Sequence, residues 1–488
     1  MTGPLPVPSP SGARVAGDRY QWLVAWHACL TVLHDAATGA SNPAVSVGVE
    51  ADNAGNLDDV VIRRRRPPHS YKQVKYAVDS RTPVNGGYLT APSRAGGPSI
   101  LAKIATAWCD LTATGDPVGL AIITNRAPDP ADPLISGRDA RTRLLLPRAS
   151  AGGPASARGK ARTAWAEAAG LTEAKLLDLL AVLDFDLARD RLRLEETVKL
   201  TMFVAGLRGD DLALAAGADW VAEQVVAGRR EFGLDAIQDA VNNRGLRAGP
   251  ARTIVSIATL APDRLAVQAA HAIDWVDRFA GTDAYAKRRP KPPATWQQLQ
   301  ADIENIPAQL GAASPVAITG SLRLASAFTV GAALRMVTST DIAVMQRGTP
   351  WTSDAPYTTP ITPTSAEYAI GQGDDIAIAI EIATTMTADV QAFLQDRQIP
   401  VGRLVVLGPP GCPRDNAVAG PEQACALAVG LRDHARHAAH HHPRVHLFLA
   451  TPMGLALLLG HRWNRVAPTI VYEDLAALGY EAAFTISA

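Results

Sequence analysis

The chain has 488 residues, with 47 basic and 47 acidic side chains, so its formal net charge is zero. One hydrophobic core rarely supports a chain of this length, so the sequence predicts two or three domains. The balanced charge excludes a strongly basic field over the whole protein, and any contact with nucleic acid must therefore come from local patches.

The four cysteines lie far apart without a CxxC pair, which argues against a zinc ribbon or a disulfide framework. The Pro-, Gly- and Ser-rich start lacks the apolar core of a signal peptide. No later stretch reaches the roughly 18 uninterrupted apolar residues of a membrane span. We therefore expect a soluble protein in the reducing cytoplasm, with no membrane partner.

Residues 1–160 are predicted to form an α/β domain. Apolar side chains recur at helical spacing over 18–36, which indicates an amphipathic helix. A helix, then mostly strands, then a helix and a strand is a compact arrangement with the sheet in the middle. The elements that follow the first helix are strands at 44–50, 57–64 and 70–77, a helix at 99–113 and a strand at 117–124.

Residues 161–292 are predicted to be a helical connecting region, because 165–280 is Ala- and Leu-rich with helical periodicity. Flexible joints are expected on either side, at 148–161 and at the proline-dense 287–293. This region would separate the first domain from the carboxyl-terminal one.

Residues 293–488 are predicted to form a Rossmann-like domain. Continuous apolar strands alternate with helices, which is typical of a largely parallel sheet covered on both faces. A ligand is expected outside the carboxyl ends of these strands. The predicted strands are 315–320, 341–347, 375–383, 403–408, 444–450 and 468–474.

The stretch YKQVK, within the strand predicted at 70–77, raises a question of chemistry. Alternation puts Gln73 and Lys75 on one face of this strand. If the strand pairs with the preceding one in an antiparallel hairpin, Asp59 faces Val74. A carboxylate, an amide and an ammonium group would then converge within a few ångströms.

This grouping has the chemistry that phosphodiester hydrolysis requires. Asp59 and Gln73 offer oxygen ligands to a hard ion such as Mg²⁺ or Mn²⁺, which polarises the phosphoryl oxygen and activates water. Lys75 would stabilise the developing charge or orient the water. Glu50 offers a further carboxylate, and Asp58 is a rival of Asp59 for the aspartate position.

Four consecutive arginines, Arg63, Arg64, Arg65 and Arg66, fall in the predicted hairpin turn. Adjacent guanidinium groups suit contacts to phosphates without base specificity. We expect them to hold double-stranded DNA beside the site, with a solvated turn as the alternative.

The spacing D(x13)QxK, from Asp59 to Gln73 and Lys75, resembles the PD-(D/E)xK restriction-endonuclease-like nucleases, in the Mrr-type variant with Gln at the middle acid. Residues 293–488 resemble the SAVED sensor domain, made of two CARF-like halves, most clearly over HLFLATPMGLALLLGHRWNRVAPTIVYED. The stretches GDRYQ, DDVVI, YKQVKYAV and AIITNRAPDPADPL look like the nuclease domain fused to SAVED in effectors of the CBASS antiphage systems.

These resemblances imply a metal-dependent DNA endonuclease that stays idle until its sensor binds a cyclic oligonucleotide, commonly a cyclic trinucleotide, and the sensors self-associate. The ring size, bases and linkage of the ligand, the oligomer geometry and the cleavage preference stay open. Two alternatives remain. One is a nuclease that answers cyclic oligoadenylate from type III CRISPR, and the other is a sensor that binds DNA without cutting it.

For ligand contacts the sequence offers loop positions at strand ends. Gly320 and Ser321 are expected to hold a phosphate at a helix N-terminus. Trp351 is expected to stack on a base, with ordinary packing as the alternative. The equivalent positions of the second half are Thr451, Pro452 and Met453.

Overall fold

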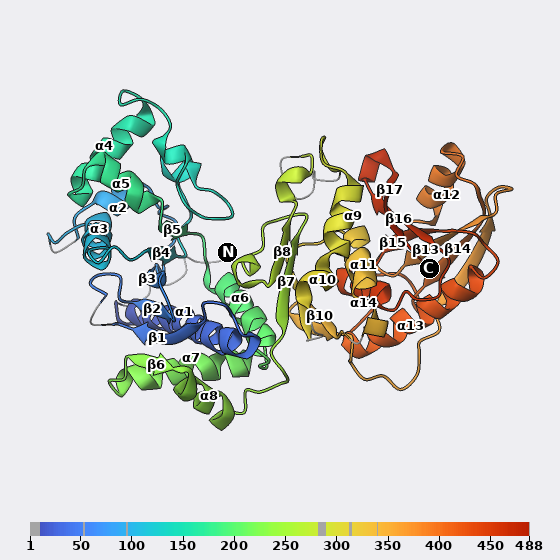
Figure 1. Cartoon of the computed structure of the whole chain (residues 1–488), viewed down its shortest axis with the longest axis horizontal. Helices are drawn as coiled ribbons and strands as arrows, with labels where there is room; N and C mark the ends of the chain where they lie inside the picture. The colour runs from blue at the N-terminus through green and yellow to red at the C-terminus, as the bar shows by residue number, and fades with distance from the viewer. Residues whose placement is uncertain are drawn as a thin grey trace, which may run out of the picture. The chain divides into compact units, whose positions relative to one another are not determined.

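The structure is a computed structural model that describes residues 10–51, 54–93, 96–281, 289–311, 315–338 and 340–487. It divides into two compact units, Met1–Ala251 and Arg252–Ala488. The first is built on one six-stranded sheet and the second on sheets of five and six strands (Figure 1). In the described ranges, no helix is both long enough and apolar enough to cross a membrane.

The sheet of the first unit has the strand order β5-β4-β3-β2-β1-β6. β1 and β2 are antiparallel, as are β2 and β3, whereas β3, β4 and β5 run parallel. The predicted order of a helix, three strands, a helix and a fourth strand is therefore confirmed. The strands are β1 (Ala44–Val49), β2 (Val60–Arg64), β3 (His69–Lys75), β4 (Val118–Thr124), β5 (Leu183–Asp186) and β6 (Glu231–Gly233).

Helices cover both faces of this sheet. Val74 and Ile123 enter the apolar cluster under α1, α6, α7 and α8, while Tyr71 and Leu120 enter the cluster under α2 to α5. The alternation of the strands thus feeds two cores. The helices are α1 (Pro10–Thr38), α2 (Gly86–Thr90), α3 (Ile100–Leu111), α4 (Ala157–Ala169), α5 (Glu173–Leu180), α6 (Arg191–Val204), α7 (Asp211–Val226) and α8 (Leu234–Asn243), with short 3₁₀ helices at Ile135–Gly137 and Arg148–Ser150.

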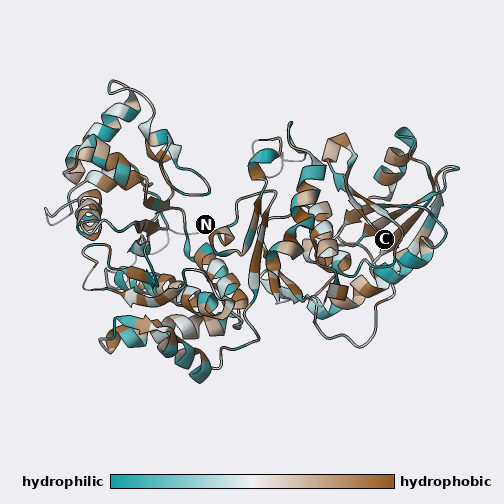
Figure 2. Cartoon of the chain, in the orientation of Figure 1, coloured by the Kyte–Doolittle hydropathy of each residue, from teal (hydrophilic) through white to brown (hydrophobic). Residues whose placement is uncertain are grey.

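The second unit contains two mostly parallel sheets, ordered β11-β10-β9-β7-β8 and β12-β14-β13-β15-β16-β17. Their central strands are apolar (Figure 2), and every residue of β13 is buried, as strands covered on both faces must be. The strands are β7 (Thr253–Ala258), β8 (His271–Asp274), β9 (Val316–Thr319), β10 (Ile342–Gln346), β11 (Thr349–Thr352), β12 (Thr364–Ala369), β13 (Asp375–Glu381), β14 (Val401–Gly408), β15 (Val445–Ala450), β16 (Thr469–Asp474) and β17 (Tyr480–Ile486).

Two helices of the second unit, one after β9 and one after β15, cross in direct backbone contact. A Cβ added at Gly331 of α11 would lie 2.0 Å from the Leu457 carbonyl oxygen, and one at Gly460 of α14 would lie 1.9 Å from that of Phe328. Only glycine fits at either position. The helices are α9 (Trp296–Glu304), α10 (Ile306–Leu310), α11 (Leu324–Ala333), α12 (Thr387–Asp396), α13 (Pro421–Ala438) and α14 (Met453–His461), with short 3₁₀ helices at Ala266–Gln268, Val276–Arg278, Met336–Thr338 and Ala476–Leu478.

The predicted helical connecting region, 161–292, does not form a separate part of the structure. Its strands β5 and β6 complete the first sheet, and β7 and β8 belong to the five-stranded sheet of the second unit. These strands are only three to six residues long and alternate with Ala- and Leu-rich helices, so helical periodicity dominates the sequence pattern. The joint predicted at 148–161 contains the start of α4, and residues 287 and 288 of the second joint lie outside the described residues.

Candidate active site and ligand surface

Asp59 lies immediately before β2 and contacts the end of β3. Gln73 Nε2 donates to Asp59 Oδ2, and the Val74 N–H donates to the same oxygen at 2.7 Å. Lys75 Nζ lies 3.7 Å from that oxygen, and its side chain is 42% exposed. The structure therefore brings Asp59, Gln73 and Lys75 together at a position that a substrate can reach.

The pairing register of β2 and β3 differs by one residue from the prediction. Val60 pairs with Lys72 and Val61 with Tyr71, so Asp59 continues the ladder opposite Gln73 and not opposite Val74. The length of the connecting loop sets this register, and the sequence pattern leaves that length open. Asp59, Gln73 and Lys75 still lie together, because Asp59 is just before β2 and its side chain contacts the end of β3.

Asp58 and Asp59 have different surroundings. Burial is the main cause that raises the pKa of the Asp58 carboxyl, and the charge of Asp59 raises it further, against a backbone hydrogen bond and the charges of Lys75 and Arg230. Asp58 therefore lies within electrostatic range of the site. Of the two aspartates, Asp59 is the one in contact with the amide of Gln73.

Glu50 follows β1 with a φ of +51°, and its N–H lies 3.5 Å from the Asp59 carbonyl oxygen. Its carboxylate lies 3.9 Å from Arg230 Nη2. The backbone of Glu50 is thus next to Asp59, but its side chain pairs with an arginine instead of joining the predicted oxygen ligands.

The four arginines at 63–66 do not lie beside the site. They are at the far end of β2, with Arg63 roughly 13 Å from Asp59 along the strand. Two of them form ion pairs with acidic side chains of the same unit. The pairs are Arg63 Nε with Glu231 Oε1 at 3.5 Å and Arg64 Nη1 with Asp35 Oδ2 at 3.1 Å.

Two side chains near the site were not predicted. Gln21 of α1 donates from Nε2 to the Asp59 carbonyl oxygen at 3.3 Å, and Arg230 donates from Nη1 to the Glu50 carbonyl oxygen at 3.0 Å. Gln21 falls in the quoted stretch GDRYQ but only as one position of a helix. Arg230 is 180 residues from Glu50 along the chain, and no local pattern connects them.

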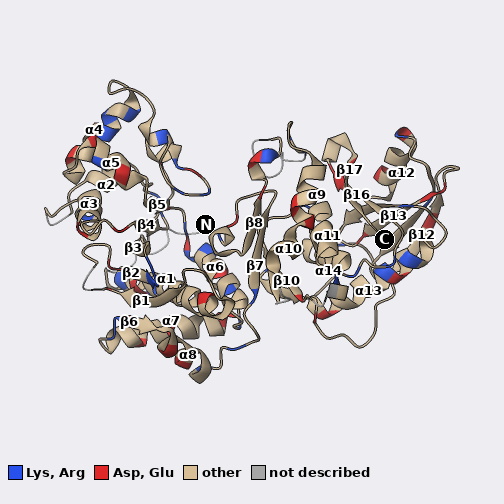
Figure 3. Cartoon of the chain, viewed as in Figure 1, with Lys and Arg blue, Asp and Glu red and all other residues tan. Residues whose placement is uncertain are grey.

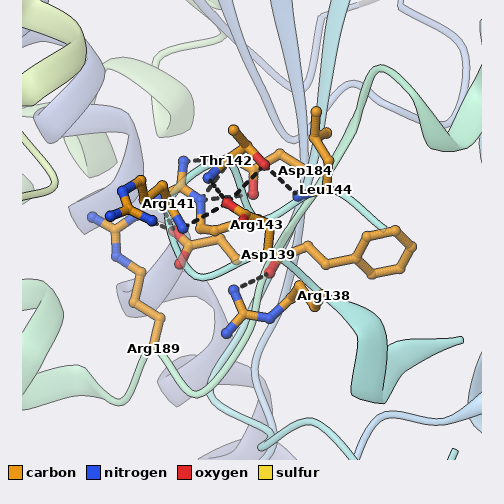
Figure 4. A network of polar contacts seen from close by, with 10 residues as sticks. Arg138, Asp139, Arg141, Thr142, Arg143, Leu144, Asp184 and Arg189 are labelled. Carbon is orange, nitrogen blue, oxygen red and sulfur yellow. Dashed lines mark hydrogen bonds and ion pairs between the residues drawn. The ribbon is translucent and has the colours of Figure 1, made fainter. Parts of the chain in front are cut away.

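Lys72, the other lysine of YKQVK, lies on the opposite face of β3 from Gln73. Burial lowers the pKa of its ammonium to about 8, and Arg189 and Arg143 lower it further. Figure 4 shows the neighbouring network, in which Arg143 Nε donates to Asp184 Oδ1 at 2.8 Å. This network ties the edge strand β5 to the 138–144 loop and is separate from the Asp59 contacts.

The donor set at Asp59 fits a hard divalent ion held by few protein ligands. All the described contacts to the Asp59 side chain go to Oδ2, which leaves Oδ1 for an ion, and the Gln73 amide can turn its oxygen toward it. In the part of the chain that the structure describes, no three His, Cys, Asp or Glu side chains form a metal-binding group. Mg²⁺ commonly uses one or two carboxylates with waters and substrate phosphates, so the set is sufficient.

In the second unit, Gly320 and Ser321 join two strand ends. Gly320 has a φ of +95°, and a Cβ there would lie 2.2 Å from the Ile257 carbonyl oxygen. Ser321 Oγ donates to the Ala261 carbonyl oxygen at 2.7 Å and accepts from its N–H at 2.6 Å. Both residues therefore fasten the loop after β9 to the loop after β7.

The N-terminus of α11, predicted to hold a phosphate, is occupied by a side chain of the protein. The Ala325 N–H donates to Glu473 Oε2 at 3.2 Å, and Arg323 Nη1 lies 3.5 Å from Glu473 Oε1. Burial raises the pKa of Glu473 to about 7, against the opposing charge of Arg323. This buried carboxylate takes the place that the prediction gave to a ligand phosphate.

Trp351 is a core residue, so the prediction that it stacks on a base is wrong. Its side chain is 4% exposed, and a Cβ at Gly454 would lie 2.8 Å from its ring. Thr451 is buried as well, while Pro452 caps α14 and Met453 begins it, both partly buried. The indole therefore supports the α14 N-terminus instead of facing solvent.

The two sheets of the second unit meet near this point. The Gly454 N–H of α14 donates to Gln346 Oε1 at the carboxyl end of β10, at 2.9 Å. The next residue, Arg347, is 58% exposed, and its guanidinium lies 4.0 Å from Asp415 of the loop after β14. This meeting of strand ends from both sheets is the candidate ligand surface, because ligands of open parallel sheets bind at carboxyl ends.

Residues 299–486 match the family model of SAVED, the "SMODS-associated and fused to various effectors sensor domain". These residues, less than half of the chain, form a SAVED sensor domain, as predicted. The five-stranded sheet begins earlier, with β7 at Thr253. No curated protein matches the chain.

Solved structures that match the chain include Cap4 SAVED/CARF-domain containing receptors. The receptor of Acinetobacter baumannii with the cyclic trinucleotide 2′3′3′-cAAA is 13% identical, with a TM-score of 0.43, over 99% of this chain and 100% of that one. The same receptor with 3′3′3′-cAAA gives the same values. The Moraxella osloensis receptor is 12% identical, with a TM-score of 0.41, over 97% of this chain and 99% of that one.

Proposed function

We propose that the chain is a metal-dependent DNA endonuclease of the CBASS type of antiphage defence, switched on by a cyclic oligonucleotide. The observation that carries the proposal is the meeting of Asp59, Gln73 and Lys75 at the end of β3, in a chain whose residues 299–486 match a sensor domain that is fused to effectors. The nuclease supplies the effector, and the sensor supplies its control.

The three side chains have distinct roles in this proposal. Asp59 and Gln73 would hold a Mg²⁺ or Mn²⁺ ion, and such an ion would supply Lewis-acid polarisation of the scissile phosphate and a lower pKa for the attacking water. Lys75, whose Nζ lies 3.7 Å from Asp59 Oδ2, places its charge where negative charge develops on the phosphorus centre. Gln21 supports the backbone of Asp59 and so positions its carboxylate.

The proposed ligand of the sensor is a cyclic oligonucleotide, and a cyclic trinucleotide is the first to test. It would bind where Gln346 and Arg347 meet the N-terminus of α14 and the loop after β14. The exposed Arg347 guanidinium suits a ligand phosphate. The neighbouring backbone is fixed by Gly454 and Trp351, so the surface is formed before the ligand arrives.

The test is plasmid cleavage by the full-length protein with a panel of cyclic di-, tri- and tetranucleotides, with Mg²⁺ or with EDTA. Cleavage with one ligand class, abolished by EDTA, is expected. Retardation of the plasmid without cleavage, with every ligand and with either Mg²⁺ or Mn²⁺, would refute the nuclease and favour a sensor that only binds DNA. Activation by cyclic oligoadenylates of larger rings alone would favour the CRISPR-linked alternative.

A further inference from the structure

Asp59 and Lys75 of the proposed site lie along one edge of the first sheet, the edge where strands end or begin, across the strand direction. β3 and β4 run toward this edge, β2 and β6 start from it, and β1 ends there. The residues at this edge, which we call the Lys75 edge, are Arg126 after β4, Lys75, Asp59, Glu50 and Arg230 before β6. Two arginines therefore flank the proposed catalytic residues.

Arg230 is held at its end of the Lys75 edge by the chain around it. Its carbonyl oxygen accepts from the Val49 N–H at 2.8 Å, which fixes the start of β6 beside the end of β1. Its Nη1 donates to the Glu50 carbonyl oxygen at 3.0 Å, and the side chain stays 47% exposed. Its Nη2 lies 3.9 Å from Glu50 Oε2, so the guanidinium stays beside the end of β1.

Arg126 is held in the same way at the other end. Its Nη1 donates to the Thr82 carbonyl oxygen at 2.6 Å, and its guanidinium carbon lies 5.3 Å from the centre of the Tyr88 ring. Asn125 joins the ends of β3 and β4 through hydrogen bonds to both backbone groups of Ala77. These contacts fix the Arg126 guanidinium beyond the end of β4, one strand away from Lys75.

The spacing along the Lys75 edge suits a nucleic-acid backbone. Neighbouring strands lie about 4.8 Å apart, so the four steps from β4 to β6 span roughly 19 Å. One DNA strand places a phosphate about every 3.4 Å along the helix axis, so the edge covers on the order of five phosphates. Guanidinium groups bind phosphates with two parallel hydrogen bonds.

We infer that Arg126 and Arg230 bind the DNA backbone on the two sides of the scissile phosphate. This inference rests on the proposed nuclease function and names the residues that hold its substrate. The arginines at 63–66 follow the other end of β2, so they lie away from the Lys75 edge and from DNA bound along it. Acidic and basic residues are interspersed over both units (Figure 3), so local placement decides where DNA binds.

The experiment compares two double variants with the same change of charge, each in full-length protein that also carries Lys75→Ala, so that DNA is bound but not cut. One combines Arg126→Gln with Arg230→Gln, and the matched control combines Arg65→Gln with Arg66→Gln. Binding of a short labelled duplex is measured from about 50 to 200 mM salt, with and without the activating cyclic nucleotide. Thermal unfolding checks that both variants fold.

The Arg126 and Arg230 pair is expected to weaken binding by about tenfold and to reduce the salt slope by about two. The control pair should change neither. Equal losses from both pairs, or a loss from the control pair alone, would overturn the inference. If the Lys75→Ala protein binds DNA but the unsubstituted chain never cleaves it, the nuclease is refuted, and the comparison of the two pairs then decides only whether Arg126 and Arg230 bind the DNA backbone. No DNA binding at all would refute both.

Discussion

Asp59 receives a side-chain amide, a backbone N–H and an ammonium group on one oxygen, so its charge is already partly balanced before any ion binds. Asp58, by contrast, has a pKa raised by burial. The two neighbouring aspartates therefore have different surroundings, and only Asp59 contacts both Gln73 and Lys75.

This difference predicts the effect of single substitutions on cleavage. Asp59→Asn and Lys75→Ala should each lower the rate by about 10²-fold or more, because each removes a charge that acts on the reacting phosphate. Asp58→Asn should cost less. Rates of plasmid cleavage under saturating ligand measure this, and Lys175→Ala, an exposed lysine of α5, is the control. A larger loss from Asp58→Asn than from Asp59→Asn would reverse the assignment.

The sequence was sufficient for the central part of this site and not for its surroundings. Gln73 and Lys75 follow from strand alternation alone. Asp59 follows from the hairpin, even with its register one residue off. Arg230 does not, because it reaches the site through a three-residue strand at the far edge of the sheet. The burial of Trp351 could not be predicted, because a tryptophan that follows a strand gives the same sequence pattern whether it is packed or exposed.

Glu473 gives a prediction about stability and pH. Burial raises the pKa of its folded form to about 7, above the ordinary value of 4.5. The folded state therefore prefers the protonated form, so this group's contribution to stability is full below pH 4.5 and is lost as the pH rises toward 7.

Glu473→Gln should consequently remove a fall in melting temperature between about pH 5 and 7. The measurement is the difference between the melting curves of the variant and the original protein at each pH. Glu304→Gln, a change on the exposed side of α9, is the control. A difference that does not vary with pH would mean that Glu473 is ionised throughout, paired with Arg323.

At the scale of elements, long strands and helices were predictable and short edge strands were not. The strands expected in the carboxyl-terminal part lie within two residues of observed ones at every end, because continuous apolar runs bounded by loops leave little choice. β11 and β12 escaped notice. All six residues of β12 are exposed, so no burial pattern marks it, and only pairing with β14 makes it a strand.

The crossing of α11 and α14 gives a prediction at this scale. Gly331→Ala or Gly460→Ala should lower the free energy of unfolding by about 1–3 kcal/mol, because the new methyl group meets backbone atoms that cannot move aside alone. Chemical denaturation followed by tryptophan fluorescence measures it. Gly17→Ala, in α1 with open space around its Cβ, should be neutral or stabilising.

An unchanged midpoint for both α11 and α14 variants would mean that the two helices separate readily. The double variant is informative as well. Because the two glycines meet neighbouring parts of the same contact, their effects should not add.

For the whole molecule, the proposed active site and the proposed ligand surface belong to different compact units. A ligand can then influence cleavage only by binding one arrangement of the protein better than another. Self-association of the sensor is the arrangement that we expect, because a nuclease with few metal ligands and no net charge gains DNA contacts when copies assemble.

The expected result is a cleavage rate that rises more steeply than linearly with protein concentration, together with a ligand-induced increase in mass. Light scattering with and without the activating cyclic nucleotide measures the mass. Full activation at constant mass would contradict assembly and leave a change within one chain as the explanation. Arg347→Ala should reduce activation and mass together, whereas Arg278→Ala, an exposed arginine of the same unit, should not.

The glycine crossing of α11 and α14 also bears on how the sensor recognises its ligand. At Gly331 and Gly460 no side chain separates the two backbones, so the helices cannot come closer at these positions without a backbone clash. Gln346 and Gly454, on either side of the ligand surface, are therefore held at a constant separation before binding. Such preorganisation reduces the conformational entropy lost on association. We therefore expect the sensor to discriminate among cyclic nucleotides by the size of their rings, because its ligand surface does not change shape to fit each one.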